Sequence, residues 1–135
     1  KIDEYLNLKI KRRESFRPFA PSIIEHEVLN WFEQKCKSPY MSFVLDVKND
    51  KKKIIPAVTH FNGTGRLQTV TEKLNKKYYN LINEFYKITK VPILLNTSFN
   101  ENEPIVCNPD DALKCFLRTK MDVLCLQNFI MVRKS

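Results

Sequence analysis

Glycine is nearly absent from the sequence. The 135 residues contain two glycines, Gly63 and Gly65, both within the single segment FNGTGR at residues 61–66. Neither GxxxxGK[ST] nor GxGxxG occurs, which excludes a P-loop and a Rossmann dinucleotide fingerprint. The backbone freedom that glycine provides is therefore concentrated at one loop.

Metal-ligating residues are few and poorly spaced. The chain has two histidines and four cysteines, and no two cysteines have the CxxC spacing, which argues against a structural zinc site. Cys107, Cys115 and Cys125 lie in apolar stretches, where we expect small buried side chains. We predict no metal site in this chain, and we interpret the cysteines as reduced and the compartment as cytoplasmic.

Long hydrophobic runs are missing as well. No apolar stretch approaches the 18 residues of a membrane span, and no signal peptide is present. The chain opens at Lys1 without a methionine, which we interpret as a cut within a longer gene. Its length fits one domain, residues 1–135, and a hydrophobic content of 43% is enough for a core.

The charge is strongly positive. Lys and Arg total 23 against 15 Asp and Glu, a formal net charge of +8. Such a balance favours anionic partners, among them nucleotides, phosphates and RNA. The alternative is a solvated lysine-rich surface, which the lysine runs at residues 51–53 and 76–77 favour.

Periodicity predicts an α/β fold: a mixed, twisted sheet with flanking helices. The clearest helix carries apolar residues at i, i+4, i+7 and i+8 from Leu74. A second begins with Asn108 as its cap and Pro109 at its first position. The expected helices are 26–34, 75–90 and 109–119. The expected strands are 14–24, which is partly irregular, 40–47, 54–61, 66–70, 93–98, 104–107 and 123–132. Strands 40–47 and 54–61 are expected to form a hairpin, and 123–132 to be buried.

Three polar segments are candidates for chemistry. If residues 11–19 are extended, Lys11, Arg13 and Arg17 project to one side and can hold a polyphosphate, although a basic surface strand paired with acids explains them equally well. The second segment, at the end of an apolar strand, can bind phosphate or ribose, or be a simple turn; it holds Asn96, Thr97, Ser98 and Asn100. The third is THFNGTGR, residues 59–66, where Arg66 follows the glycines; His60 can be a base or a ligand there, although a structural, hydrogen-bonding histidine is more common.

The same segments carry a family resemblance. The motifs are IKRRESFRPFAPSI (10–23), SPYM (38–41), PAVTHFNGTGRLQTV (56–70) and LINEFYKITKVPILLNTSFNENEPIVCNP (81–109). With them the chain resembles the C-terminal, YrdC-like domain of the nodulation-protein and cephamycin-type O-carbamoyltransferases, the family of the tobramycin enzyme. In YrdC-type proteins a KxR and an SxN pattern bind ATP. Here they match Lys11 to Arg13 and Ser98 to Asn100.

The resemblance implies a two-step reaction. Carbamoyl phosphate and ATP, with Mg²⁺, give a carbamoyl-adenylate and pyrophosphate, and the carbamoyl group then passes to a hydroxyl-bearing small-molecule acceptor. It assigns the first step to this domain. Negative charge develops on the phosphate oxygens in that step, and we expect Lys11, Arg13, Arg17 and Arg66 to be the catalytic cations that stabilise it. It assigns the second step to an N-terminal ASKHA-type domain that holds iron and is missing from this chain. The alternatives are an RNA-binding YrdC-like module and a structural docking domain; no membrane contact is expected.

Overall fold

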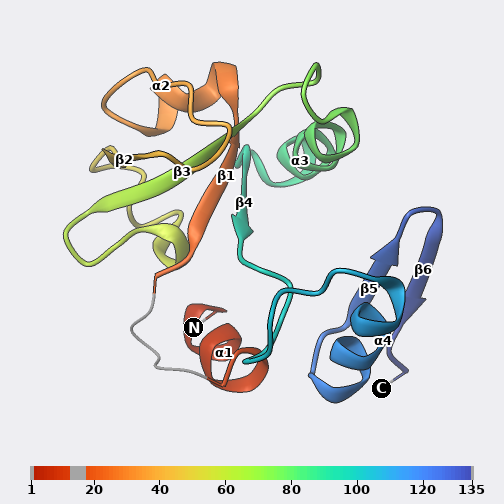
Figure 1. Ribbon diagram of the computed structural model, residues 1–135. Coiled ribbons are helices and arrows are strands. Elements are labelled where there is room, and N and C mark those ends of the chain that lie inside the picture. The colour runs from red at the N-terminus through yellow and green to blue at the C-terminus, as the bar shows by residue number, and fades with distance from the viewer. Residues whose placement is uncertain (1, 13–17, 135) are drawn as a thin grey trace. The chain divides into compact units, whose positions relative to one another are not determined.

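The chain folds into two compact units, one formed by residues 1–17 with 98–135 and one by residues 18–97. Figure 1 shows the computed structural model, which describes residues 2–12 and 18–134. Sheets and helices occur together, and the α/β prediction is confirmed. Within the described residues, no helix is both long and apolar enough to cross a bilayer.

Unit 18–97 is built on a mixed four-stranded sheet in the order β2-β3-β1-β4. Strand β1 pairs in parallel with β3 and antiparallel with β4, and β2 pairs antiparallel with β3. The short strand β1 is buried along its whole length, as suits a central strand. The strands are β1 (Ala20–Ile24), β2 (Phe43–Asp46), β3 (Thr64–Val70) and β4 (Ile93–Asn96).

Helix α3 (Lys76–Thr89) confirms the predicted helix at 75–90, but its apolar stripe is only half buried. Ile82 is fully buried against Ile24 of β1 and Val70 of β3. Leu81 and Ile88 are 57% and 82% exposed. The helix packs on the sheet through the side that carries Ile82. Leu81 and Ile88 lie on other sides of the helix and face outward.

The opposite face of this sheet is covered by loops and short helices rather than by a second long helix. These are the 3₁₀-helices η2 (Glu25–Glu27) and η3 (Pro56–Val58) and the short helix α2 (Val28–Trp31). The predicted helix at 26–34 is therefore too long, because Phe32 leaves helical geometry to pair with Val47. The predicted strand at 54–61 is wrong, since Pro56 starts a 3₁₀ turn and β2 pairs with β3 instead. The predicted strand at 104–107 is wrong too, because these residues form no strand between β4 and α4.

The other unit, residues 1–17 with 98–135, has helices in both of its chain segments. They are α1 (Ile2–Tyr5), the π-helix η1 (Leu6–Ile10) and α4 (Pro109–Arg118). The predicted helix at 109–119 is confirmed, with the Asn108 side chain accepting the amide of Asp111 at 2.8 Å.

The predicted strand at 123–132 is instead a hairpin of β5 (Val123–Leu126) and β6 (Phe129–Val132). The predicted strand is interrupted after Leu126, because Gln127 takes a left-handed φ of 52° and the chain turns back there. Burial of the cysteines is confirmed only for Cys115, which lies on the buried side of α4. Cys107 and Cys125 are exposed.

Candidate functional site

Lys11 lies at the end of η1, and its side chain is buried. Its backbone amide closes the π-helix by donating to Leu6 O at 2.8 Å, and the residue is only 2% exposed. Its ammonium group donates to four oxygens of two residues: Ser98 O, Ser98 Oγ at 3.2 Å, Asn100 O at 2.7 Å and Asn100 Oδ1 at 2.8 Å. These four oxygens are neutral, so they position the ammonium without adding negative charge beside it.

Asn100 organises the turn that receives Lys11. Its Oδ1 accepts from Ser98 Oγ at 2.6 Å, and its Nδ2 donates to the backbone oxygen of Glu103 at 2.7 Å. The backbone N–H of Asn100 also donates to Ser98 O at 3.2 Å, which tightens the turn. Lys11, Ser98 and Asn100 thus form one hydrogen-bonded cluster, although 87 residues separate Lys11 from Ser98. We call these three residues the lysine cluster.

A buried carboxylate supports the lysine cluster on both flanks. Glu101, whose side chain is 6% exposed, accepts from Arg12 Nε and Arg118 Nε, each at 2.8 Å. Arg118 Nη2 also reaches Glu103 at 2.6 Å. Glu101 follows Asn100 directly in the chain, and Arg12 follows Lys11 directly. The ion pair between Glu101 and Arg12 therefore holds together the two chain segments that form the lysine cluster.

Glu103 is the most strongly perturbed acid of the described residues. Hydrogen bonds from its own backbone amide and from the amides of Glu101 and Asn102, together with the Cys115 thiol, hold its pKa at about 2 rather than 4.5. Its Oε2 accepts from the amides of Glu101 and Asn102 at 3.2 and 3.0 Å. Burial first, and then the Glu103 carboxylate, raises the pKa of Cys115.

The depressed pKa of Glu103 makes a prediction for acid unfolding. A carboxyl whose pKa is lower in the folded state stabilises the fold above its unfolded pKa and loses that contribution as the pH falls through its folded pKa. We expect the contribution to be complete above about pH 4.5 and to fade toward pH 2. In Glu103→Gln, urea unfolding at pH 5 and pH 2.5 should show a smaller acid-induced loss than in the wild type. An equal loss in both proteins would contradict this.

A second polar cluster lies on the face of the four-stranded sheet, beyond the end that α3 covers. Gln68 Oε1 accepts from Ser22 Oγ and from Asn96 Nδ2, each at 2.8 Å, and Gln68 Nε2 donates to Pro39 O at 3.2 Å. Ser22 is fully buried. Burial raises the pKa of Tyr78, and its hydrogen bond with Ser22 opposes that rise. The sheet face therefore changes from apolar under α3 to polar at Ser22, Gln68 and Asn96.

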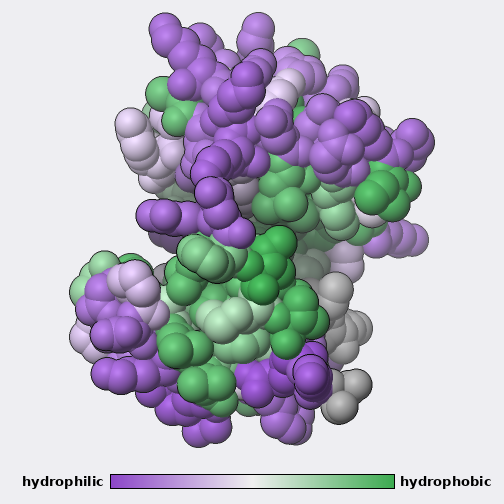
Figure 2. All heavy atoms as spheres, turned by 90° about the vertical axis from the view of Figure 1, so that its right-hand side faces the viewer, coloured by the Kyte–Doolittle hydropathy of each residue, from purple (hydrophilic) through white to green (hydrophobic). Residues whose placement is uncertain are grey.

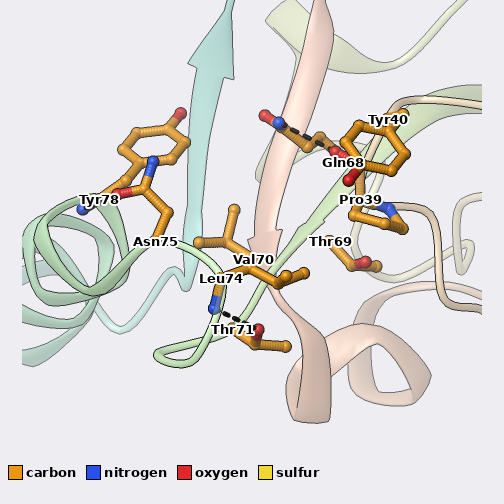
Figure 3. Close-up of a pocket in the computed structure, with 9 residues that line it drawn as sticks. All are labelled: Pro39, Tyr40, Gln68, Thr69, Val70, Thr71, Leu74, Asn75 and Tyr78. Atoms are coloured by element: carbon orange, nitrogen blue, oxygen red, sulfur yellow. Dashed lines mark hydrogen bonds between the residues drawn. The ribbon is translucent and has the colours of Figure 1, made fainter.

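A shallow hollow opens beside this sheet-face cluster. It measures about 220 Å³, and Figure 3 shows Tyr78 of α3 and Tyr40 on opposite sides of it, with Gln68 at its edge. That volume lies below the roughly 300 Å³ at which small-molecule pockets usually begin. We assign no ligand to it.

Gln68 is expected to be a structural centre of this unit. Gln68→Met removes the oxygen that accepts hydrogen bonds from both Ser22 and Asn96. The buried Ser22 hydroxyl then loses that hydrogen-bond partner. We expect the free energy of unfolding to fall by about 1–3 kcal/mol. Denaturant titration measures this, with the exposed Gln34→Met as the matched control. A loss no larger than that of the control would show that the network adds nothing to stability.

Arg66 projects from the exposed side of β3. It stands opposite Val44 of β2 and, two residues from Gln68, on the same face of the sheet. Burial first, and then the charge of Arg66, lowers the pKa of His60. His60 Nδ1 lies 3.1 Å from Thr64 Oγ1, which gives the imidazole a sufficient structural role.

The predicted site residues thus have three different outcomes. The structure brings Lys11, Ser98 and Asn100 together. Arg66, Asn96 and Thr97 belong to the other unit, where Asn96 bonds Gln68. Arg13 and Arg17 lie outside the described residues. Sequence reasoning missed Arg118, because it is 17 residues from its partner Glu101 and no spacing rule pairs the two.

Across residues 2–12 and 18–134, no group of three or more His, Cys, Asp and Glu side chains is placed to hold an ion. A magnesium ion that accompanies a nucleotide is commonly held by phosphate oxygens with one or two carboxylates.

The comparison with known proteins decides the family. The carbamoyltransferase C-terminus family matches residues 1–133. This chain belongs to that family. It is 47% identical to nodulation protein NolO of Bradyrhizobium diazoefficiens over 96% of its length, and 44% identical to nodulation protein NolNO of Sinorhizobium fredii, also over 96%. With nodulation protein U of Rhizobium tropici it shares 38% over 73% of its length.

The chain corresponds to only part of these relatives. It spans 24% of NolO, 20% of NolNO and 17% of nodulation protein U. This carbamoyltransferase domain is thus similar to a quarter or less of each longer protein, and the resemblance to the C-terminal domain of the nodulation-protein carbamoyltransferases is confirmed.

Proposed function

We propose that this carbamoyltransferase domain binds ATP and forms a carbamoyl-adenylate from it and carbamoyl phosphate. The observation that supports this is the lysine cluster, in which Lys11 is held by Ser98 and Asn100, the residues of the KxR and SxN patterns. A buried, prepositioned ammonium is suited to a phosphate because it needs no reorganisation when charge develops. In this proposal the domain is YrdC-like.

The proposed chemistry balances as two linked displacements. Water takes the phosphoryl group from carbamoyl phosphate, which releases orthophosphate and carbamate. A carbamate oxygen then attacks the α-phosphorus of ATP, the bond to the bridging oxygen breaks, and pyrophosphate leaves. Negative charge grows on the phosphate oxygens, and Lys11, Arg13, Arg17 and Arg66 are the proposed cations that stabilise it. Mg²⁺ accompanies the nucleotide, with Asn96, Thr97, Ser98 and Asn100 as further proposed nucleotide contacts.

The second half of the reaction is proposed to lie elsewhere in the full-length protein. The carbamoyl group passes to the hydroxyl of a small-molecule acceptor, in an N-terminal ASKHA-type domain that holds iron. The domain described here needs no nucleophilic side chain for its own step. It is expected by itself to bind ATP weakly and to carbamoylate no acceptor, and robust transfer by residues 1–135 alone would contradict this division.

Substitution of Arg66 can distinguish a role in phosphate binding from a role in support of the fold. The side chain is exposed on β3, so Arg66→Ala should change the free energy of unfolding by no more than about 0.5 kcal/mol. Loss of a charge-assisted contact should weaken ATP binding by about 1.5–3 kcal/mol. Arg66→Lys should restore part of the affinity, because a single ammonium replaces the bidentate fork.

The test is calorimetric titration with ATP beside thermal melting, both on the full-length enzyme. If Arg66→Ala unfolds the domain while the affinity of each folded molecule stays unchanged, Arg66 has a structural role only. The pKa of His60 provides a check in the same variant, because removing the neighbouring charge should raise it.

A further inference from the structure

The β5–β6 hairpin is apolar on both of its faces. Residues alternate between the faces along each strand, and the register pairs Leu124 with Met131 and Cys125 with Ile130. On the first face, Leu124 packs with Ala112 and Phe116 of α4, and Leu126 and Met131 join them. Most of this face has its cover within the unit, although Phe129, beside the turn, is 76% exposed.

The second face consists of two cross-strand pairs, Val123 with Val132 and Cys125 with Ile130. Val123, Ile130 and Val132 are 48%, 69% and 68% exposed, and Cys125 is exposed too. Figure 2 shows hydrophobic side chains gathered over this hairpin. We call these four residues the hairpin face. It contains no charged residue, although antiparallel sheets that meet water normally alternate apolar and polar positions.

An isolated two-stranded sheet is marginally stable in water, and packing against a helix stabilises it, as α4 does here on one side. The sequence VLCLQNFIMV carries the pattern of strands buried on two sides, and α4 covers one side. A solvated hairpin of this composition would also be exposed to edge-to-edge association. The second side is therefore built to be covered.

We propose that the hairpin face docks against the part of the full-length carbamoyltransferase that lies outside this chain. The relatives NolO and NolNO are four to five times as long as the region that this chain matches, since it covers 24% and 20% of them. The face is small: four side chains fall well short of the roughly 800 Å² per partner of a stable intermolecular interface. A covalently linked neighbour needs far less area, because the effective concentration of a tethered partner is in the millimolar range.

The partner surface must be apolar and uncharged, to match a face without charge. This inference rests on family membership and not on ATP binding, so the two can fail separately.

The first experiment is photo-crosslinking of the full-length protein with p-benzoylphenylalanine incorporated at Ile130. We expect mass spectrometry to find it joined to a peptide from outside residues 1–135. The same group at Lys114, an exposed position of α4, is the matched control and should form no such link. A crosslink from position 130 to any residue within 1–135, of the same or of a second molecule, would overturn the proposal, and so would the absence of a crosslink.

A second measurement needs no substitution at the face. Cys125 lies on it, whereas Cys107 is exposed at the start of α4. Hydrogen bonding to Asp111 raises the pKa of Cys107, which slows its alkylation. We nevertheless expect Cys125 in the full-length protein to react with iodoacetamide at least about tenfold more slowly than Cys107, because docking covers it. If Cys125 reacts at the same rate or faster, the face is open to solvent and the proposal is wrong.

Discussion

Lys11→Met should reduce the affinity of the full-length carbamoyltransferase for ATP by roughly 10- to 150-fold. The substitution keeps an unbranched apolar stem in the buried position and removes only the ammonium. A charge-assisted hydrogen bond is worth about 1.5–3 kcal/mol, which corresponds to that range of affinity. Stability should fall as well, because Ser98 and Asn100 each lose a donor that contacts two of their oxygens. The measurement is ATP titration, expressed per folded molecule from circular dichroism.

The matched control is Lys9→Met. Lys9 lies in the same π-helix two residues earlier, and its side chain is exposed. It carries the same change of charge without the contacts to Ser98 and Asn100. We expect Lys9→Met to bind ATP within about twofold of the wild type, because the exposed charge of Lys9 is screened by solvent and salt. Equal losses in the two variants would mean that net charge, rather than the lysine cluster, controls binding.

Glu101→Ala should give the largest loss of stability among the changes near the lysine cluster. The carboxylate is nearly buried and joins Arg12 to Arg118, with both distances 2.8 Å. Both arginines are about half exposed, at 60% and 47%, so they can turn to water once the carboxylate is gone. The cost should therefore stay at about 1–3 kcal/mol, that of lost charge-assisted hydrogen bonds. It is below the 3–5 kcal/mol of a charge left buried without a partner.

The chain offers an exposed ion pair as the comparison. Lys87 contacts Glu84 at 2.6 Å on α3, but both side chains are more than 60% exposed. Glu84→Ala should cost at most about 0.5 kcal/mol, since exposed pairs contribute little. Urea titration of both variants measures the difference. If the two substitutions cost the same, Glu101 does not hold the lysine cluster in place.

Helix signals in this sequence are local, and they predicted the helices well. Asn108 and Pro109 define the start of α4, and Asn75 with the left-handed Lys90 bounds α3. Pairing between strands depends on residues far apart, and it was predicted less well. The expected hairpin between residues 40–47 and 54–61 fails because Pro56 cannot donate a ladder hydrogen bond, so β2 pairs with β3 at Thr64–Val70.

The contacts of the candidate site could likewise be predicted only in part. The pairing of Lys11 with Ser98 and Asn100 could be expected from the two short motifs, and the structure confirms the contact. Glu101 and Arg118 could not be expected, because a charge network across two chain segments leaves no periodic pattern. One buried strand was predicted from the apolar run at 123–132, and the structure forms a hairpin there instead. The structure covers one face of it, which is the observation behind the docking proposal.

The most direct test of the proposed function is the release of pyrophosphate by the full-length protein. ATP and carbamoyl phosphate are supplied together and separately, without any acceptor, and pyrophosphate and orthophosphate are measured. The account predicts that both products form in equal amounts only when both substrates are present, and that Lys11→Met abolishes their formation while Lys9→Met does not. Pyrophosphate release that does not depend on carbamoyl phosphate, or that persists unchanged in Lys11→Met, would contradict it.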